Sequence, residues 1–343
     1  MASLSQSANL IALTGTTNTV FLQGEPGIGK SSILKMMEAQ HGDKYQYIYA
    51  DCPLMDLPDF AMPMVDQETK TTHFAPSSLW GFNDPRPKMI MLDEVSKAPN
   101  VVKPMFTRLM LERCIGEFKL PEGSMVFATG NNASDGVGDT MQGHINNRVT
   151  RIPVAKPSSE AFIDWGISNG VDEVILTIVH KMPHLMNSYI DDPENLYIFN
   201  PKRNTGAFAS PRSLTKAGYI VAQRALLGSE LTQEALAGTV GLSLAGDIVA
   251  FALIGDSLPE WDAIKKNPAK AHIPEGAPAQ IMLALGSIRL VDKSNAEAFV
   301  TYFSRFPLEV KMLWARQFKT RLENVMGVAA FRTLLVENHW VFG

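Results

Sequence analysis

The residues with the clearest chemical meaning form a glycine-rich loop near the start of the chain. Its sequence is Gly24-Glu25-Pro26-Gly27-Ile28-Gly29-Lys30-Ser31, followed by Ser32, and it meets the pattern G-x-x-x-x-G-K-[ST] in full. Such a loop turns backbone N–H groups and the N-terminus of a helix toward phosphate. In this pattern Lys30 reaches the β- and γ-phosphates and Ser31 holds Mg²⁺. The sequence therefore predicts a site for a nucleotide and its magnesium ion.

Two acids follow an apolar run further along the chain. Residues 89–92, Met-Ile-Met-Leu, lead directly into Asp93 and Glu94. This pattern is typical of a buried parallel strand that delivers carboxylates to the C-terminal edge of a sheet, where open α/β sheets bind ligands. Asp93 is predicted to coordinate Mg²⁺ through water, and Glu94 to polarise the attacking water. Alone the pattern fits an ordinary strand end, but its place behind a second predicted strand favours the catalytic interpretation.

A polar run follows the next predicted core strand. Residues 124–128 are apolar after Ser124, and they end in Thr129-Gly130-Asn131-Asn132. A polar side chain at that strand end would face the γ-phosphate beside Glu94.

Three arginines are candidates for a role at the phosphates. A glycine-rich loop at 135–139 and a predicted helix lead into a predicted fifth strand, with arginines at Arg148 and Arg151. A surface salt bridge is the commoner role of an arginine, but one of the two could act as an arginine finger in a neighbouring subunit. Arg212 lies in the first turn of a helix predicted to begin with Ser210 as N-cap and Pro211 at N1. Because the helix dipole disfavours a cation there, Arg212 is also considered for function.

The first half of the chain is predicted to build a parallel sheet. Strands are expected at 20–23, 46–50, 89–92 and 124–128, and a helix at 29–40 follows the glycine-rich loop. The order strand, helix, strand implies parallel pairing. A helix at 99–113 and a small hairpin turning at Gly116 complete this half. Residues 54–87 are proline-rich without sustained period and are predicted to form a long loop, equally consistent with a functional loop and a surface insertion.

The second half is predicted to be helical. Apolar residues recur at near-helical spacing over 159–168, 172–181, 211–226, 232–237 and 242–254. A polar connector is expected from 256 to 278, and a last helical section runs from 279 to 343. Its aromatic residues favour a core role over a binding face.

Composition limits the class of protein. The 343 residues are 45% hydrophobic and 19% charged, as in ordinary globular proteins. The net charge of −4 argues against a general nucleic-acid coat. No secretory signal is recognised, no apolar run approaches the ~20 residues of a membrane-spanning helix, and two cysteines cannot form a disulfide framework. A cytoplasmic protein without a membrane partner is therefore expected.

In the order and spacing of these motifs, the chain resembles the MoxR branch of the AAA+ ATPases from about residue 20 to 226. In that family the glycine-rich loop corresponds to Walker A and the strand ending in Asp93 and Glu94 to Walker B. The resemblance implies that Asn131 is sensor 1, with Asn132 as a neighbour that could exchange roles with it. The arginine finger corresponds to Arg148 in Asn147-Arg148-Val149, and sensor 2 to Arg212 in Ala209-Ser210-Pro211-Arg212. The segment 54–81 is similar to the family's insertion after the second strand, and the turn at Gly116 is similar to its pre-sensor-1 hairpin.

The resemblance implies a fold and an activity. The implied fold is an α/β, Rossmann-like αβα P-loop core of the AAA+ type at residues 1–155, an α-helical lid at 156–256 and a helical C-terminal extension at 257–343. Subunits of this family form a ring, usually a hexamer, with ATP and Mg²⁺ at each interface. The implied function is hydrolysis of ATP to remodel or mature a protein partner, often with a second partner that bears a von Willebrand factor A domain.

Three alternatives stay open. An AAA+ motor acting on nucleic acid would share every catalytic residue and differ in having a basic pore, for which Lys119, Lys202 and Arg203 are too few to decide. A ring that binds ATP as a switch without turnover is disfavoured by Glu94. A monomeric kinase would leave Arg148 and Arg212 unexplained.

Overall fold

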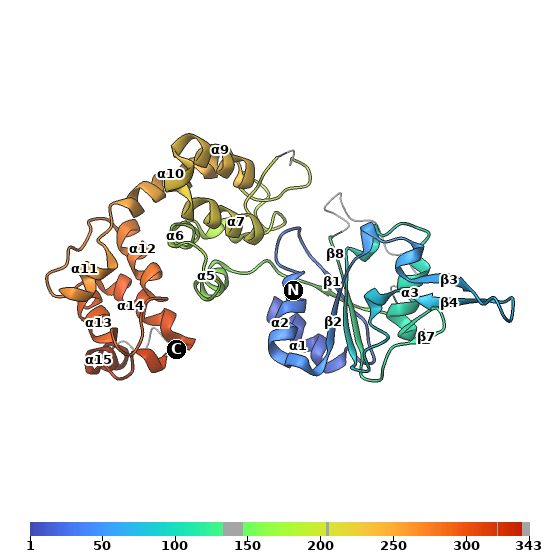
Figure 1. Cartoon of the computed structure of the whole chain (residues 1–343). Coiled ribbons are helices and arrows are strands. Elements are labelled where there is room, and N and C mark those ends of the chain that lie inside the picture. Colours follow the sequence, from blue (N-terminus) through green and yellow to red (C-terminus); the bar gives the residue numbers. More distant parts are fainter. Residues whose placement is uncertain (133–146, 204–205, 321, 338–343) are drawn as a thin grey trace. The chain divides into compact units, whose positions relative to one another are not determined.

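The structure is a computed structural model, and it describes residues 1–132, 147–203, 206–320 and 322–337 (Figure 1). Contacts divide it into two compact units. Residues 1–156 and 200–203 form the first unit, and residues 157–199 and 204–343 form the second. The predicted division at residue 256 falls inside the second unit, so a separate lid and extension stay a prediction.

A five-stranded parallel sheet is the centre of the first unit. Its strands are β1 (Val20–Gln23), β2 (Gln46–Asp51), β5 (Lys88–Asp93), β8 (Met125–Gly130) and β9 (Thr150–Pro153), in the order β2-β5-β8-β1-β9. The predicted parallel pairing is confirmed throughout. Because β8 lies between β1 and β5, the polar end of β8 separates the glycine-rich loop from the two acids. The strand order therefore brings all three predicted motifs to one edge of the sheet.

Both faces of this sheet are buried, which explains the continuous apolar runs of its strands. Met89 and Met91 of β5 pack in a cluster with residues of α1 (Leu4–Thr14) and α2 (Ser32–His41). Ile90 and Leu92 pack in the opposite cluster with α3 (Lys103–Glu112). Alternate side chains of one strand thus point to opposite layers, which gives the predicted αβα arrangement.

The prediction of a long loop at 54–87 is wrong in part, because this segment contains an antiparallel hairpin. Strands β3 (Ala61–Val65) and β4 (Thr72–Pro76) pair with each other, and Figure 1 shows the hairpin extending away from the sheet. Short 3-10 turns at 52–54, 57–59 and 78–80 flank it. The hairpin gives little sequence signal because Pro63 lies inside a strand and the connecting turn contains no glycine.

Two other predictions for the first unit have clear outcomes. The small hairpin is confirmed as β6 (Cys114–Ile115) and β7 (Phe118–Lys119), with Gly116 at φ 56° in the turn. The glycine-rich loop predicted at 135–139 and the helix predicted after it lie outside the described residues.

The second unit consists of helices, as predicted. They are α5 (Ser159–Ser168), α6 (Glu173–Lys181), α7 (Pro211–Ala222), α8 (Arg224–Leu227), α9 (Ser229–Val240), α10 (Leu242–Asp256), α11 (Trp261–Lys266), α12 (Ala277–Ser287), α13 (Ala296–Phe303), α14 (Leu308–Arg316) and α15 (Ala329–Glu337). Two details differ from expectation. The helix predicted at 211–226 breaks at Gln223, and α11 interrupts the predicted connector.

The aromatic residues near the C-terminus belong to the core of this unit, as predicted. Phe299, Tyr302, Phe303 and Trp314 are all at most 1% exposed. The Trp314 ring stacks on Phe303 with centroids 4.7 Å apart, and its Nε1 donates a hydrogen bond of 2.9 Å to Ser287 Oγ. The hydrogen bond satisfies the only polar atom of the indole, and the stack buries its ring.

One described segment has the length and hydropathy to cross a membrane. It spans Leu242–Lys266, with a mean hydropathy of 1.4 and 22% of its apolar window buried. In this structure the segment is broken between α10 and α11 around Pro259. Leu244, Ala245 and Ile248 of α10 lie in the core of the second unit. One such segment is weak evidence for a membrane span, because core helices of globular proteins meet the same criteria.

Asp172 makes the stability of the second unit depend on pH. It is the N-cap of α6 and accepts a hydrogen bond of 2.9 Å from Val174 N. Burial, and next the charge of Glu173, raise the pKa of Asp172 to about 6. Since this pKa is raised in the folded state, the carboxyl stabilises the fold fully below about pH 4, and that contribution is lost as the pH rises through about 6.

Asp172→Asn is therefore expected to raise the free energy of unfolding by ~1–2 kcal/mol at pH 8, because asparagine caps a helix as well and carries no buried charge. At pH 4 the variant and the parent protein should differ little. Urea unfolding followed by circular dichroism at both pH values measures this. An equal effect at the two pH values, or a loss of stability at pH 8, would contradict the argument.

Candidate site for nucleotide binding and hydrolysis

The glycine-rich loop joins the end of β1 to the start of α2, the context predicted for it. Gly27 and Gly29 have φ angles of 78° and 101°, a region that residues with a Cβ atom rarely adopt. A Cβ atom at Gly24 would lie 2.9 Å from the carbonyl oxygen of Val154, next to the end of β9. The pattern thus places glycine where the backbone turns sharply or where another strand approaches closely.

Lys30 lies inside this loop. The residue is 8% exposed, and its Nζ donates to Gly24 O at 2.7 Å, to Glu25 O at 2.8 Å and to Asn131 Oδ1 at 3.1 Å. These three bonds match the three hydrogens of an ammonium group. The structure therefore brings Lys30 and Asn131 together, and the ammonium has to exchange partners to contact a phosphate.

The two serines after Lys30 differ in what their hydroxyls do. Ser31 is the N-cap of α2 but makes no side-chain capping hydrogen bond. The Ser32 hydroxyl instead donates to Gly29 O at 2.6 Å, which ties it to the loop. Of the two, Ser31 is the one whose hydroxyl is available for the predicted metal role.

Asp93 is held at the edge of the sheet by two hydroxyl groups. Thr129 Oγ1 donates a short hydrogen bond to its Oδ1, and the Tyr49 hydroxyl donates to its Oδ2 at 2.9 Å. Burial, and next the hydrogen bond to Asp93, raise the pKa of Tyr49. The strands on both sides of β5 thus orient this carboxylate. Sequence reasoning missed both partners. The pairing of Leu92 with Ala128, which places Thr129 beside Asp93, belongs to the tertiary structure and leaves no signal in the sequence of either strand.

Glu94 sits in a strained turn directly after β5. Its φ and ψ of 50° and 40° are left-handed, which costs a residue with a side chain of order 1 kcal/mol and is frequent at functional sites. Glu94 Oε1 accepts from Asn131 Nδ2 at 3.1 Å, and Oε2 lies 2.7 Å from Lys97 Nζ. Sequence reasoning also missed Lys97. A lysine three residues after an acid is common on protein surfaces, so this spacing gives no signal of a functional contact.

A continuous chain of polar contacts therefore joins the three predicted motifs. Lys30 donates to the oxygen of the Asn131 amide, and the nitrogen of that amide donates to Glu94. The Thr129 hydroxyl accepts from the backbone N–H of Glu94 at 3.3 Å and donates to Asp93. Asn131 is only 6% exposed. Strand order explains the arrangement, since β8 lies between the other two strands. Asn132, the predicted neighbour, is partly buried and follows on the same segment.

The predicted arginines have different surroundings. Arg148 is exposed just before β9. Arg151 Nε donates to Gln23 Oε1 at 3.1 Å, and its guanidinium lies over the Phe21 ring at 5.7 Å. Arg151 is thus engaged within its own subunit, which favours Arg148 as the candidate finger.

Arg212 belongs to the second unit. The predicted helix start is confirmed, with Ser210 as N-cap in a capping box with Ser213 and with Pro211 in the first turn. Arg212 itself is exposed. Its predicted role at the γ-phosphate stays a prediction.

The oxygen donors at the edge of the sheet fit the predicted magnesium ion. Mg²⁺ prefers hard oxygen ligands and usually keeps several waters, so one hydroxyl and one carboxylate suffice on the protein side. Ser31 and Asp93 would hold it, directly or through water. When bound, the ion would neutralise phosphate charge.

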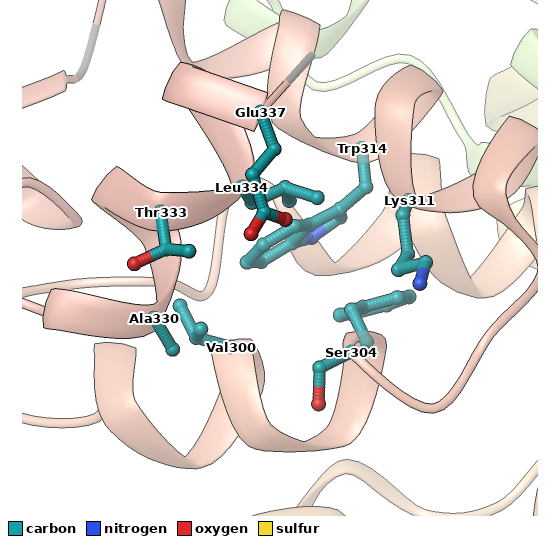
Figure 2. Close-up of a pocket in the computed structure, with 9 residues that line it drawn as sticks. Val300, Ser304, Lys311, Trp314, Ala330, Thr333, Leu334 and Glu337 are labelled. Atoms are coloured by element: carbon teal, nitrogen blue, oxygen red, sulfur yellow. The ribbon is translucent and has the colours of Figure 1, made fainter.

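A separate pocket of about 380 Å³ lies in the second unit, among α13, α14 and α15. Figure 2 shows Trp314 among the lining side chains, with Lys311 and Glu337 as its charged members. None of the residues to which the sequence assigns chemistry lines this pocket. The candidate site therefore stays at the edge of the sheet.

Comparison with known proteins gives matches among solved structures alone. No protein-family model and no curated protein matches the sequence. The chain is similar to NtrX from Brucella abortus in complex with ATP, at 12% identity and TM-score 0.39, over 99% of this chain and 67% of that one. It is also similar to the RuvB Holliday junction branch migration motor of Thermotoga maritima, at 12% identity and TM-score 0.38, over 78% and 75% of the two chains.

The functional argument accordingly rests on the geometry of the site. That geometry consists of a glycine-rich phosphate loop, a parallel sheet that carries two acids and an asparagine at one edge, and a helical second unit. These features confirm the predicted α/β class, with a phosphate loop on a parallel sheet and a helical second half. The chain has an α/β fold with a parallel sheet, a phosphate-binding loop and a helical C-terminal part.

Proposed function

We propose that this protein is an AAA+ ATPase of the MoxR type, which hydrolyses ATP in a ring to remodel or mature a protein partner. The observation that carries the ATPase assignment is the polar chain Lys30–Asn131–Glu94 beside Asp93. Phosphoryl transfer to water needs positioning and charge neutralisation more than covalent chemistry, and these residues supply both.

Each residue has a distinct task in this proposal. Lys30 and the loop from Gly24 to Ser32 bind the phosphates, and Asp93 with Ser31 holds Mg²⁺. Glu94 orients the attacking water and accepts its proton. Asn131 holds Glu94 and Lys30 in one network.

The ring and its partners rest on the family resemblance together with Arg148. Arg148 is exposed and precedes β9, so it lies at the end of the parallel strands opposite the acids of its own site. It is therefore suited to act on the site of a neighbouring subunit. The proposed assembly is a homo-oligomer, a hexamer by resemblance, with Arg212 closing the site from the helical unit. The proposed location of the assembly is the cytoplasm. Its proposed substrate is a protein, with a von Willebrand factor A domain protein as a second partner.

Steady-state phosphate release from ATP tests this assignment. We expect turnover that requires Mg²⁺, stops when the metal is chelated, rises with protein concentration as rings assemble, and is unchanged by double-stranded DNA. A salt-sensitive stimulation by DNA would transfer the assignment to the nucleic-acid motor. Absence of turnover at every protein concentration would contradict the ATPase assignment itself.

A further inference from the structure

Glu25 brings a negative charge into a loop whose proposed ligand is a phosphate group. The residue is 6% exposed, and its backbone carbonyl accepts a hydrogen bond of 2.8 Å from Lys30 Nζ. A buried carboxylate needs a cation or hydrogen bonds to offset its loss of water, and its charge also opposes the binding of an anion. Because the Lys30 ammonium is assigned to the phosphates, the charge of Glu25 has to be offset from elsewhere in the fold.

The segment that follows β9 runs beside this loop. β1 and β9 pair in parallel up to their last residues, and Val154 N then donates to Gln23 O at 2.6 Å. One residue further, a Cβ atom at Gly24 would lie 2.9 Å from Val154 O. The two segments therefore continue side by side past the end of the sheet, where Glu25 follows in the loop and Lys156 follows after β9.

The start of the chain fixes the position of this segment. Ala2 N donates to Pro153 O at 2.9 Å, and Ala155 N donates to Ala2 O at 2.8 Å. Val154, between these two contacts, is 3% exposed and packs in one cluster with Ile28 of the loop. The backbone that leads to Lys156 is thus held between the glycine-rich loop and Ala2.

Lys156 responds to the charge of Glu25. Both residues belong to the first unit. Burial lowers the pKa of Lys156 to about 8, and the charge of Glu25 acts in the opposite direction. A carboxylate stabilises a nearby ammonium in this way because opposite charges attract. The segment after β9 therefore brings a second ammonium to the phosphate loop, in addition to that of Lys30.

We propose that Lys156 is a positioning residue that offsets the charge of Glu25 at the phosphate loop, and that this pair sets the affinity for the phosphate groups of a nucleotide. The inference rests on the proposed ATPase function, and it assigns the pair no part in the attack of water. It differs from a purely structural ion pair in one respect. Loss of either partner of a structural pair would weaken nucleotide binding, whereas here the two losses act in opposite directions.

Lys156→Met and Glu25→Gln test the proposal, because each removes one charge and keeps the approximate length of the side chain. We expect the Kd of a fluorescent ATP analogue to rise about three- to tenfold in Lys156→Met and to fall by a similar factor in Glu25→Gln, the range for one charge near a ligand at the effective dielectric of a protein surface. KM for ATP should follow Kd, with kcat within about twofold of the parent. The double variant, in which both charges are absent, should bind within about twofold of the parent.

Two further measurements separate charge from structure. Both shifts in Kd should be larger for the ATP analogue than for the corresponding ADP analogue, because they act on phosphate charge, and both should shrink with added salt. Lys156→Arg should keep the parental Kd. Lys44→Met is the matched control, since Lys44 is exposed in the 3-10 turn Gly42–Lys44 of the same unit, and its loss should leave Kd unchanged.

Weaker binding in both single variants, or an unchanged Kd in Lys156→Met, would overturn the inference and leave the proposed function intact if the parent hydrolyses ATP. If Lys156→Met does not fold, Glu25→Gln decides, because tighter binding supports the inference and weaker or unchanged binding overturns it. A parent that neither binds the analogue nor hydrolyses ATP contradicts the proposed function, and the inference fails with it.

Discussion

Glu94→Gln is expected to lower kcat for ATP hydrolysis by about 10²- to 10⁴-fold, the usual contribution of a positioned general base. The amide keeps the size of the side chain and can still accept a hydrogen bond, but it cannot take a proton from water. Nucleotide binding should persist, because Lys30 and the glycine-rich loop are untouched. Phosphate release and the binding of a fluorescent ATP analogue separate the two effects.

Glu112→Gln is the control for this variant, since Glu112 is an exposed acid that pairs with Arg108. It should hydrolyse ATP at the parental rate. Unchanged phosphate release from Glu94→Gln would refute the hydrolytic interpretation and favour the ring that binds ATP without turnover. With ATP bound, Glu94→Gln should also trap the assembled ring, so that imaging gives its size and the proteins that co-purify give its partner.

Arg148→Ala is expected to lower kcat by about 10³-fold or more, as the loss of an arginine finger does. The exposed guanidinium lies just before β9, and the loss should appear in hydrolysis but not in nucleotide binding by the isolated subunit. Arg151→Ala is the matched control three residues away. Because Arg151 contacts Gln23 and Phe21 of its own subunit, its removal should have a much smaller effect on turnover.

Mixing inactive subunits tests whether Arg148 acts across an interface. An Arg148→Ala subunit keeps an intact Glu94, and a Glu94→Gln subunit keeps an intact Arg148. In mixed rings some interfaces combine the two intact residues, so mixing should restore part of the activity. Failure to restore activity, or an equal loss in Arg151→Ala, would show that Arg148 is not a finger acting from the neighbouring subunit.

The central strands and the phosphate loop were predictable because local sequence governs them. Burial on both faces requires continuous apolar runs such as 89–92, and a tight phosphate-binding turn requires glycine at positions such as Gly27 and Gly29. The N-cap at Ser210 was predictable for the same reason, since its hydrogen bond reaches only three residues along the chain.

The hairpin β3–β4 was not predictable from the same kinds of signal. Met62, Met64 and Phe74 are about half exposed, so neither strand shows the alternation of a half-buried sheet. Pairing with each other, rather than local preference, makes these segments strands. The hairpin is also held by a tertiary contact at its base. There the buried Phe60 ring stacks on Trp80, with ring centroids 5.5 Å apart.

The sequence by itself determined which residues could do chemistry: Lys30 and Ser31 in the loop, the acids Asp93 and Glu94, and a polar side chain after the strand at 124–128, which the family resemblance identified as Asn131. It could do so because phosphate binding and metal binding restrict residue type and local spacing. Only the tertiary structure decided how these residues are connected. The order of the strands put β8 between β1 and β5, and this order gave Asn131 its contacts with both Lys30 and Glu94. Hydroxyls of Tyr49 and Thr129 reached Asp93 for the same reason, since hydrogen bonds between strands depend on register and not on distance along the chain.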